Sequence, residues 1–236
     1  MAEQPASQPE KWTFGDLVAL SALQAFTRGY VPWTAWSMRP SAIASIVNEL
    51  DRGRRRTVVE LGAGASTVFL GHALRQLGGT LTSIEHNGEY ADHVRRLVAR
   101  EGLGDVVSVE VVALAPWDAT AGEPGDSFGE GAAWRPPTSW YDADRLREVC
   151  PSGIDALVVD GPPAGKHPET LVREPAVPVL APFLAADYAI FLDDVDRPAE
   201  RETLRRWSAT LGVAVVPVAR IGLGVGRTGD GYVPTM

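Results

Sequence analysis

The sequence is short of cysteine, of long apolar runs and of basic charge, and each shortage removes a class of protein. Cys150 is its single cysteine among 236 residues, so neither an intrachain disulfide nor a zinc site built on several cysteines can form. This usage favours a reducing compartment, and we expect a cytoplasmic protein. The longest apolar stretch, residues 176–192, is interrupted by prolines and by Asp187. We therefore expect no membrane span and no membrane partner.

Basic residues are outnumbered, with 22 Lys and Arg against 30 Asp and Glu and a net charge of −8. Proteins that bind nucleic acids usually carry a basic surplus, because phosphate contacts dominate their affinity. We therefore expect no nucleic-acid partner. What the chain does contain is an ordinary globular balance of 45% hydrophobic and 22% charged residues, which excludes disorder, collagen and coiled coil.

Short apolar segments alternate with amphipathic ones over most of the chain. Strands that are apolar throughout and alternate with helices indicate a mostly parallel sheet with helices on both faces, which is a doubly wound α/β fold. The predicted strands are residues 57–61, 80–85, 106–112, 155–160, 188–192 and 213–219, with 223–229 as a weaker candidate; the predicted helices among them are 66–77, 89–100 and 197–211.

Two further helices, at residues 13–26 and 40–50, precede this pattern and flank a segment rich in aromatic residues. We interpret residues 1–50 as an N-terminal helical lid on the acceptor side, which could also form a homodimer contact. Residues 51–236 then form the core of a single domain. A stretch rich in Gly, Pro and Asp, residues 118–139, is predicted to be a long loop of the kind often tied to function.

The end of the first predicted strand suggests an anion-binding turn. Glu60 is followed by Gly62 and Gly64, and a helix is expected to open at Ser66 and Thr67. Two glycines allow a tight turn and a close backbone approach, and the free N–H groups of a helix start favour a carboxylate or phosphate. Glycine at such a turn also occurs for geometry alone.

The end of the second predicted strand supplies a carboxylate, Glu85, at the spacing expected of a nucleoside site. A carboxylate about 20 residues beyond the glycines can accept both hydroxyls of a ribose. Thr67 stands where a dinucleotide fingerprint would have its third glycine, and Glu60 would repel a phosphate but could hold an ammonium group, directly or through water. These features favour S-adenosylmethionine, and they leave a nicotinamide-dependent oxidoreductase as an alternative.

Together with SIEHN at 83–87 and VVDGPP at 158–163, this turn resembles class I S-adenosylmethionine-dependent methyltransferases. The resemblance implies a seven-stranded, Rossmann-like sheet whose last hairpin is antiparallel. It also implies roles for particular residues around the cofactor: Glu85 at the ribose, His86, Ala113 and Leu114 beside the adenine, and Trp36, Ser37 and Met38 over the methionine end.

Three further carboxylates follow the fourth and fifth predicted strands: Asp160, Asp193 and Asp194. Adjacent carboxylates repel one another, and a divalent cation relieves the repulsion; oxygen ligands favour Mg²⁺. The arrangement resembles small metal-dependent O-methyltransferases. In the alternative, Asp194 or Asp196 caps the helix at 197–211 and Asp193 pairs with Arg197, so that no metal is needed.

Methyl transfer to a hydroxyl requires a base, and Asp160 and His167 are the candidates. Trp36, Trp140 and Tyr141 are predicted to contact the acceptor, since flat aromatic faces suit a sugar or planar ring. We expect a small-molecule or oligosaccharide hydroxyl, with a sugar or glycoside first, and the Ala-, Arg-, Gly- and Val-rich composition favours an actinobacterial sugar or polysaccharide enzyme. Metal-independent methylation of a catechol or a nitrogen remains open.

Overall fold

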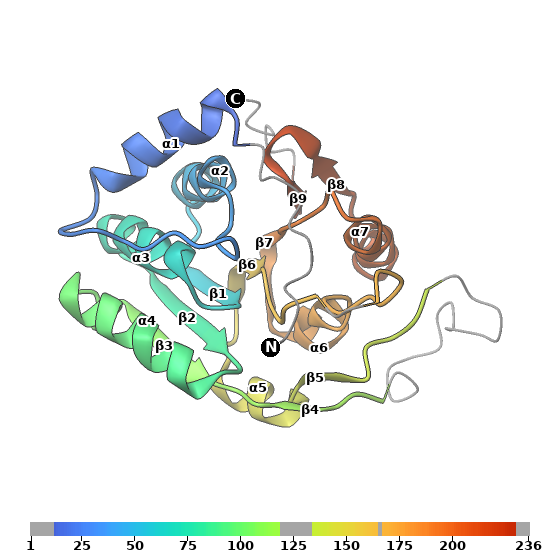
Figure 1. Cartoon of the computed structure of the whole chain (residues 1–236). Coiled ribbons are helices and arrows are strands. Elements are labelled where there is room, and N and C mark those ends of the chain that lie inside the picture. The colour runs from blue at the N-terminus through green and yellow to red at the C-terminus, as the bar shows by residue number, and fades with distance from the viewer. Residues whose placement is uncertain (1–11, 119–133, 165–166, 230–236) are drawn as a thin grey trace, which may run out of the picture.

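A seven-stranded sheet forms the centre of the computed structural model, which describes residues 12–118, 134–164 and 167–229 (Figure 1). Its strands are β1 (Thr57–Leu61), β2 (Thr80–Glu85), β3 (Val107–Val111), β6 (Ile154–Val159), β7 (Leu184–Leu192), β8 (Val215–Val218) and β9 (Leu223–Arg227). They lie in the order β3-β2-β1-β6-β7-β9-β8. Within this sheet β1, β2, β3, β6 and β7 are parallel, and β9 runs antiparallel to both β7 and β8. The predicted mostly parallel sheet with an antiparallel last hairpin is confirmed.

Helices cover both faces of this sheet, as the apolar strands require. On one face lie α2 (Pro40–Arg52), α3 (Ala65–Leu77) and α4 (Gly88–Arg100); on the other lie α5 (Ala143–Val149), α6 (Ala176–Leu180) and α7 (Pro198–Leu211). Side chains of β6 alternate between the two apolar cores: Ala156 and Val158 pack in one, and Leu157 and Val159 in the other. This two-sided burial explains why the strand has no polar face.

The N-terminal part is anchored through a buried carboxylate. Helix α1 (Phe14–Gln24) begins with a capping box between Thr13 and Asp16, and Asp16 is fully buried. Asp16 also accepts a hydrogen bond of 2.6 Å from Arg39 and contacts the hydroxyl of Ser41, at the start of α2. The position of α1 is therefore fixed relative to α2 and to the segment between them.

Some short elements were not predicted. β4 (Leu114–Pro116) and β5 (Ser139–Tyr141) pair as an antiparallel hairpin on either side of the predicted loop, of which residues 119–133 lie outside the described part. Strands of three residues are too short to show a periodic pattern. Helices α5 and α6 and the 3₁₀ turns η1 (Ala181–Phe183) and η2 (Ala219–Ile221) also lie in stretches assigned no helix. Among the helices of the described ranges, none combines the length and apolarity needed to cross a membrane.

Candidate active site

A cavity of about 980 Å³ opens at the carboxyl ends of β1, β2, β6 and β7. Strand order reverses between β1 and β6, because β2 and β3 continue to one side and β7 to the other. In open α/β sheets this switch point is where ligands bind. The residues that line the cavity include the segment from Thr34 to Arg39, the turn from Gly62 to Ser66, Glu85 to Asn87, Tyr141, the acidic residues after β6 and β7, and Arg173.

Gly62 brings the two halves of the switch point into contact. Its φ of +98° lies in a region that favours glycine. A Cβ there would meet the backbone nitrogen of Gly161 at 2.7 Å. The nitrogens of Asp160 and Gly161 both donate to the carbonyl of Leu61, at 2.8 and 2.7 Å. The ends of β1 and β6 are thus joined by backbone alone.

Glu60 lies beneath this turn and is fully buried. Its carboxylate accepts hydrogen bonds of 2.6 Å from the hydroxyls of Ser66, Thr67 and Ser83. Burial raises the pKa of Glu60 to about 7, and the three hydroxyls limit the rise. Thr67 accepts in turn from the nitrogen of Gly64 at 2.9 Å. Glu60 does not line the cavity; in this geometry it shapes the glycine turn and offers no free oxygen to an ammonium group.

Glu85, at the end of β2, presents its carboxylate to the cavity although the residue is only 5% exposed. One oxygen accepts from the nitrogen of Asn87 at 2.8 Å, which orients the group. His86 lies beside it and meets the ring of Tyr141 edge-on. The buried hydroxyl of Tyr141 also reaches the cavity and has no hydrogen-bond partner among the described residues. This half of the cavity therefore offers both an acceptor carboxylate and an unused donor.

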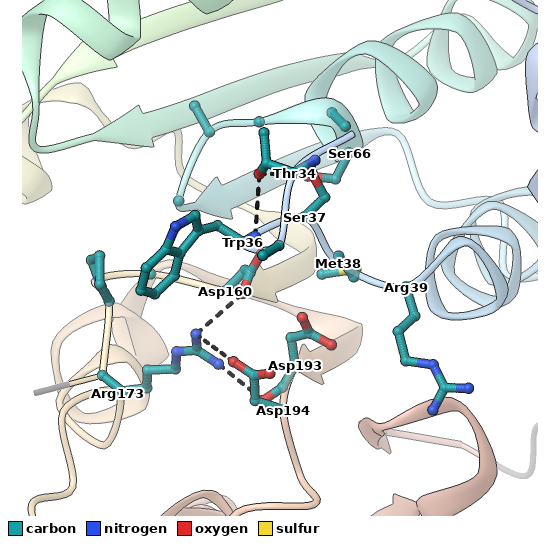
Figure 2. Close-up of a pocket in the computed structure, with 18 of the residues that line it drawn as sticks. Thr34, Trp36, Ser37, Met38, Arg39, Ser66, Asp160, Arg173, Asp193 and Asp194 are labelled. Carbon is teal, nitrogen blue, oxygen red and sulfur yellow. Dashed lines mark hydrogen bonds and ion pairs between the residues drawn. The ribbon is translucent and has the colours of Figure 1, made fainter. Parts of the chain in front are cut away.

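The other half is acidic and centres on Arg173. Carboxylate oxygens of Asp160, Asp193 and Asp194 lie within 4.8 Å of one another. The Arg173 guanidinium is 3.2 Å from Asp160 and 3.0 Å from Asp194, and it donates to the carbonyl of Asp193 at 3.0 Å (Figure 2). Burial raises the pKa of Asp160 and of Asp193, and in both cases Arg173 opposes the rise.

The alternative to a metal, in which an aspartate caps the helix and another pairs with Arg197, holds only in part. Helix α7 begins without a side-chain cap, so neither Asp194 nor Asp196 caps it. Arg197 pairs with Asp194 at 2.8 Å, whereas the alternative assigned it to Asp193. Asp194 adopts a φ of +63°, in the left-handed region that Asp tolerates better than most residues. This backbone directs its carboxylate to Arg173 and Arg197.

The donor set can be compared with the needs of Mg²⁺. Three carboxylates are suitable ligands in kind, but Mg²⁺ demands a nearly octahedral oxygen shell at about 2.0–2.1 Å. Asp160 and Asp194 are already bound by Arg173, whose side chain is 3% exposed. As arranged, the carboxylates fit a guanidinium and not a magnesium ion.

The segment between α1 and α2 covers the cavity. The nitrogen of Thr34 donates to the hydroxyl of Ser37 at 3.0 Å, and that of Trp36 donates to the hydroxyl of Thr34 at 3.2 Å. These bonds fold the segment into a turn that carries Trp36 over the site (Figure 2). Trp36 is 73% exposed, whereas Met38 is buried. A large, accessible indole at a cavity mouth is suited to contact a ligand.

Most predicted site residues meet at this cavity, but six lie elsewhere. Trp140 is fully buried and packs edge-on against Trp117 and Tyr141. Thr67 and Glu60 lie below the cavity floor. His167 has a side chain that is 76% exposed and, with Leu114, lines a separate cavity of about 450 Å³. Ala113 lines neither cavity.

Among the cavity residues to which the sequence analysis gave no role are Asn87, Tyr90 and Arg173. Asn87 caps α4 by accepting a hydrogen bond from the nitrogen of Tyr90 at 3.1 Å. An asparagine directly after a strand and before a helix is a capping signal, and it would have placed both residues near the site. For Arg173 a signal existed as well. It stands beside apolar Leu171 and Val172, and a buried arginine needs carboxylate partners of the kind at the strand ends.

The doubly wound sheet, its antiparallel hairpin and the cavity at its switch point define the class of methyltransferases with a Rossmann-like fold. The chain belongs to the methyltransferase-domain family, which matches residues 59–195. A comparison with curated protein sequences found no match.

Solved structures share the fold at low identity. A methyltransferase of Podospora anserina, PaMTH1, bound to SAH, has a TM-score of 0.56 and 15% identity over 93% of this chain and 89% of its own. An O-methyltransferase of Bacillus cereus in complex with SAH has a TM-score of 0.56 and 15% identity over 93% of both chains. Cofactor-bound Rv0187 from MTB has a TM-score of 0.54 and 17% identity over 95% of this chain and 98% of its own.

Proposed function

We propose that this methyltransferase uses S-adenosylmethionine to methylate a hydroxyl group of a small molecule. The observation that carries the proposal is that one cavity joins Glu85, next to the glycine turn, with Asp160, beside an exposed aromatic platform. Cofactor binding and methyl transfer are thus assigned to adjoining halves of one cavity. The fold neighbours from Podospora anserina and Bacillus cereus are SAH complexes, and the latter is an O-methyltransferase, which supports the same cofactor and reaction here.

The residues around the turn fit the cofactor. Gly62 lets the turn pack against the backbone of Gly161, where a side chain would collide, and the N-terminus of α3 presents N–H groups to a carboxylate. Glu85 would accept hydrogen bonds from ribose hydroxyls, and the unused Tyr141 hydroxyl adds a donor nearby. When bound, S-adenosylmethionine supplies an electrophilic methyl group on a sulfonium. Thr67 is engaged by Glu60 and Gly64, which disfavours the dinucleotide geometry of the oxidoreductase alternative.

On the acceptor side, Asp160 is the base of this proposal. Its carboxylate lines the cavity and is oriented by Arg173, so it can accept the hydroxyl proton as the oxygen attacks the methyl carbon. The new bond is O–CH₃, the carbon–sulfur bond breaks, and the sulfur leaves as a neutral thioether. Trp36 would stack on the acceptor. His167 lines the separate cavity, which disfavours it as the base.

The exposed indole of Trp36 supports an acceptor that presents a flat ring. Trp36 offers a flat face to a sugar or to an aromatic ring, and we keep a glycoside hydroxyl as the first candidate and a catechol as the second. Magnesium assistance, expected from the sequence, is not part of the mechanism, because Arg173 already binds Asp160 and Asp194.

The test is an acceptor screen of sugars, glycosides and catechols that measures release of S-adenosylhomocysteine. We expect turnover with one of these classes, abolished in Asp160→Asn and retained in His167→Gln. Cofactor binding by calorimetry should survive in both variants, which separates loss of chemistry from loss of binding. Failure of the wild-type protein to bind S-adenosylmethionine would reject the proposal; loss of turnover in His167→Gln alone would transfer the base to His167.

A further inference from the structure

Arg173 is almost completely buried although its side chain is charged. Its side chain is 3% exposed, yet it carries a full charge into the centre of an acidic cluster. Burial alone would lower its pKa, but the carboxylates of Asp160 and Asp194 raise that pKa above its ordinary value. The guanidinium therefore stays protonated and acts as a permanent positive charge.

Arg173 contacts all three residues of the acidic cluster, two through their carboxylates and Asp193 through its backbone carbonyl. The terminal nitrogen Nη2 lies between Asp160 and Asp194, at 3.2 and 3.0 Å, and Nη1 donates to the carbonyl of Asp193. Figure 2 shows the guanidinium facing the carboxylates of Asp160 and Asp194. One carboxylate oxygen of Asp160 and one of Asp194 are engaged in this way, so a divalent cation would have to compete with the guanidinium for both groups.

The charges around the acidic cluster also argue against a divalent cation there. Three carboxylates within 4.8 Å of one another repel when ionised, and a cation beside them favours the ionised forms. Arg173 supplies one charge from within, and Arg197 supplies a second through Asp194 at 2.8 Å. A divalent ion added to this set would lie against two fixed positive charges.

We propose that Arg173 is the resident cation of this carboxylate cluster, that it holds Asp160 in place without a divalent metal, and that removing its side chain opens a divalent-cation site. The inference rests on the proposed methyl transfer in the same cavity, and it makes Arg173 a positioning residue. It sets this chain apart from the metal-dependent enzymes that its sequence resembles.

Binding of Mn²⁺ to chelator-treated protein tests the proposal without cofactor or acceptor. Paramagnetic resonance of free Mn²⁺ should be unchanged by the wild-type protein and by Arg173→Lys, which keeps the charge. Arg173→Gln should take up one Mn²⁺ per chain, and the uptake should disappear when Asp193→Asn is added. Arg227→Gln is the matched control and should take up no Mn²⁺. It removes another buried arginine, whose guanidinium lies 2.8 Å from the carboxylate of Glu49 and not in this cluster.

Two results would overturn the inference. One is a stoichiometric Mn²⁺ site in the wild-type protein that Asp193→Asn abolishes, because the metal would then displace Arg173. The other is a folded Arg173→Gln protein that binds no Mn²⁺. If Arg173→Gln does not fold alone, refolding in Mn²⁺ should recover it, and failure to refold counts against the inference. Binding of SAH by the wild-type protein, measured separately, decides the proposed function itself.

Discussion

The backbone nitrogen of Gly161 stands 2.7 Å from the point that a Cβ on Gly62 would occupy. One residue follows β1 and the other follows β6, so the two sides of the switch point meet with no side chain between them. The anion-binding turn and the carboxylate of Asp160 are therefore held in one rigid arrangement. A change at either glycine is expected to disturb both binding and chemistry.

Gly62→Ala should destabilise the protein and weaken cofactor binding. The substitution combines a positive φ with a backbone clash, and we expect a loss of about 1–3 kcal/mol in unfolding free energy. Urea denaturation measures the loss, and calorimetry with SAH measures binding. Gly64→Ala is the control for stability: its backbone is extended, and a Cβ would meet only the Tyr90 hydroxyl at 3.7 Å. Equal stability of the two variants would contradict the argument.

Glu60→Gln should change how stability depends on pH. The folded-state pKa of Glu60, about 7, lies above the unfolded value, so the neutral carboxyl favours folding at low pH. This contribution is fully present below about pH 4.3 and is lost as pH rises through about 7. The stability of the wild-type protein relative to Glu60→Gln should therefore fall between pH 5 and pH 8. Urea unfolding at both values tests this, and parallel curves would show that Glu60 does not titrate there.

Asp16→Asn should loosen the N-terminal segment over the cavity. Asp16 joins Thr13, Arg39 and Ser41, and the loss of hydrogen bonds to a buried charge costs about 1.5–3 kcal/mol. These hydrogen bonds lower the pKa of Asp16 although burial opposes them, so the stabilisation is present above the unfolded pKa and is lost in acid. Thermal unfolding and SAH affinity measure the two effects. Asp92→Asn, which breaks an exposed pair with Arg95, should change neither.

Trp36→Ala should weaken acceptor binding without destabilising the fold. With 73% of the residue exposed, little apolar burial is lost, so the melting temperature should stay near that of the wild-type protein. The acceptor KM should rise while the affinity for SAH changes little. Trp140→Ala provides the contrast, because that indole is fully buried and its removal should cost about 3–5 kcal/mol. An unchanged KM in Trp36→Ala would remove Trp36 from the acceptor site.

The sequence predicted the sheet and much of the cavity because both depend on local patterns. Apolar runs marked the parallel strands, and the residues that follow them, among them Gly62, Glu85 and Asp160, reach the cavity because strand ends meet at one edge. Trp140 shows the limit, since residue type alone does not tell a buried indole from an exposed one. Arg173 shows another, because the sequence brought the three carboxylates together but did not show that the chain between β6 and β7 carries this arginine back to them.

The buried carboxyl group of Glu60, beneath the glycine turn, has a consequence for ligand binding. Burial raises the pKa of Glu60 to about 7, and its carboxyl bonds Ser66 and Thr67 in the turn proposed to bind a cofactor of net positive charge. A positive charge seated above it favours the ionised form, so the carboxyl gives up a proton as the ligand binds. Near pH 7, cofactor uptake should therefore release a fraction of a proton to the buffer. Calorimetry in two buffers of different ionisation enthalpy would record that release, and Glu60→Gln should abolish it.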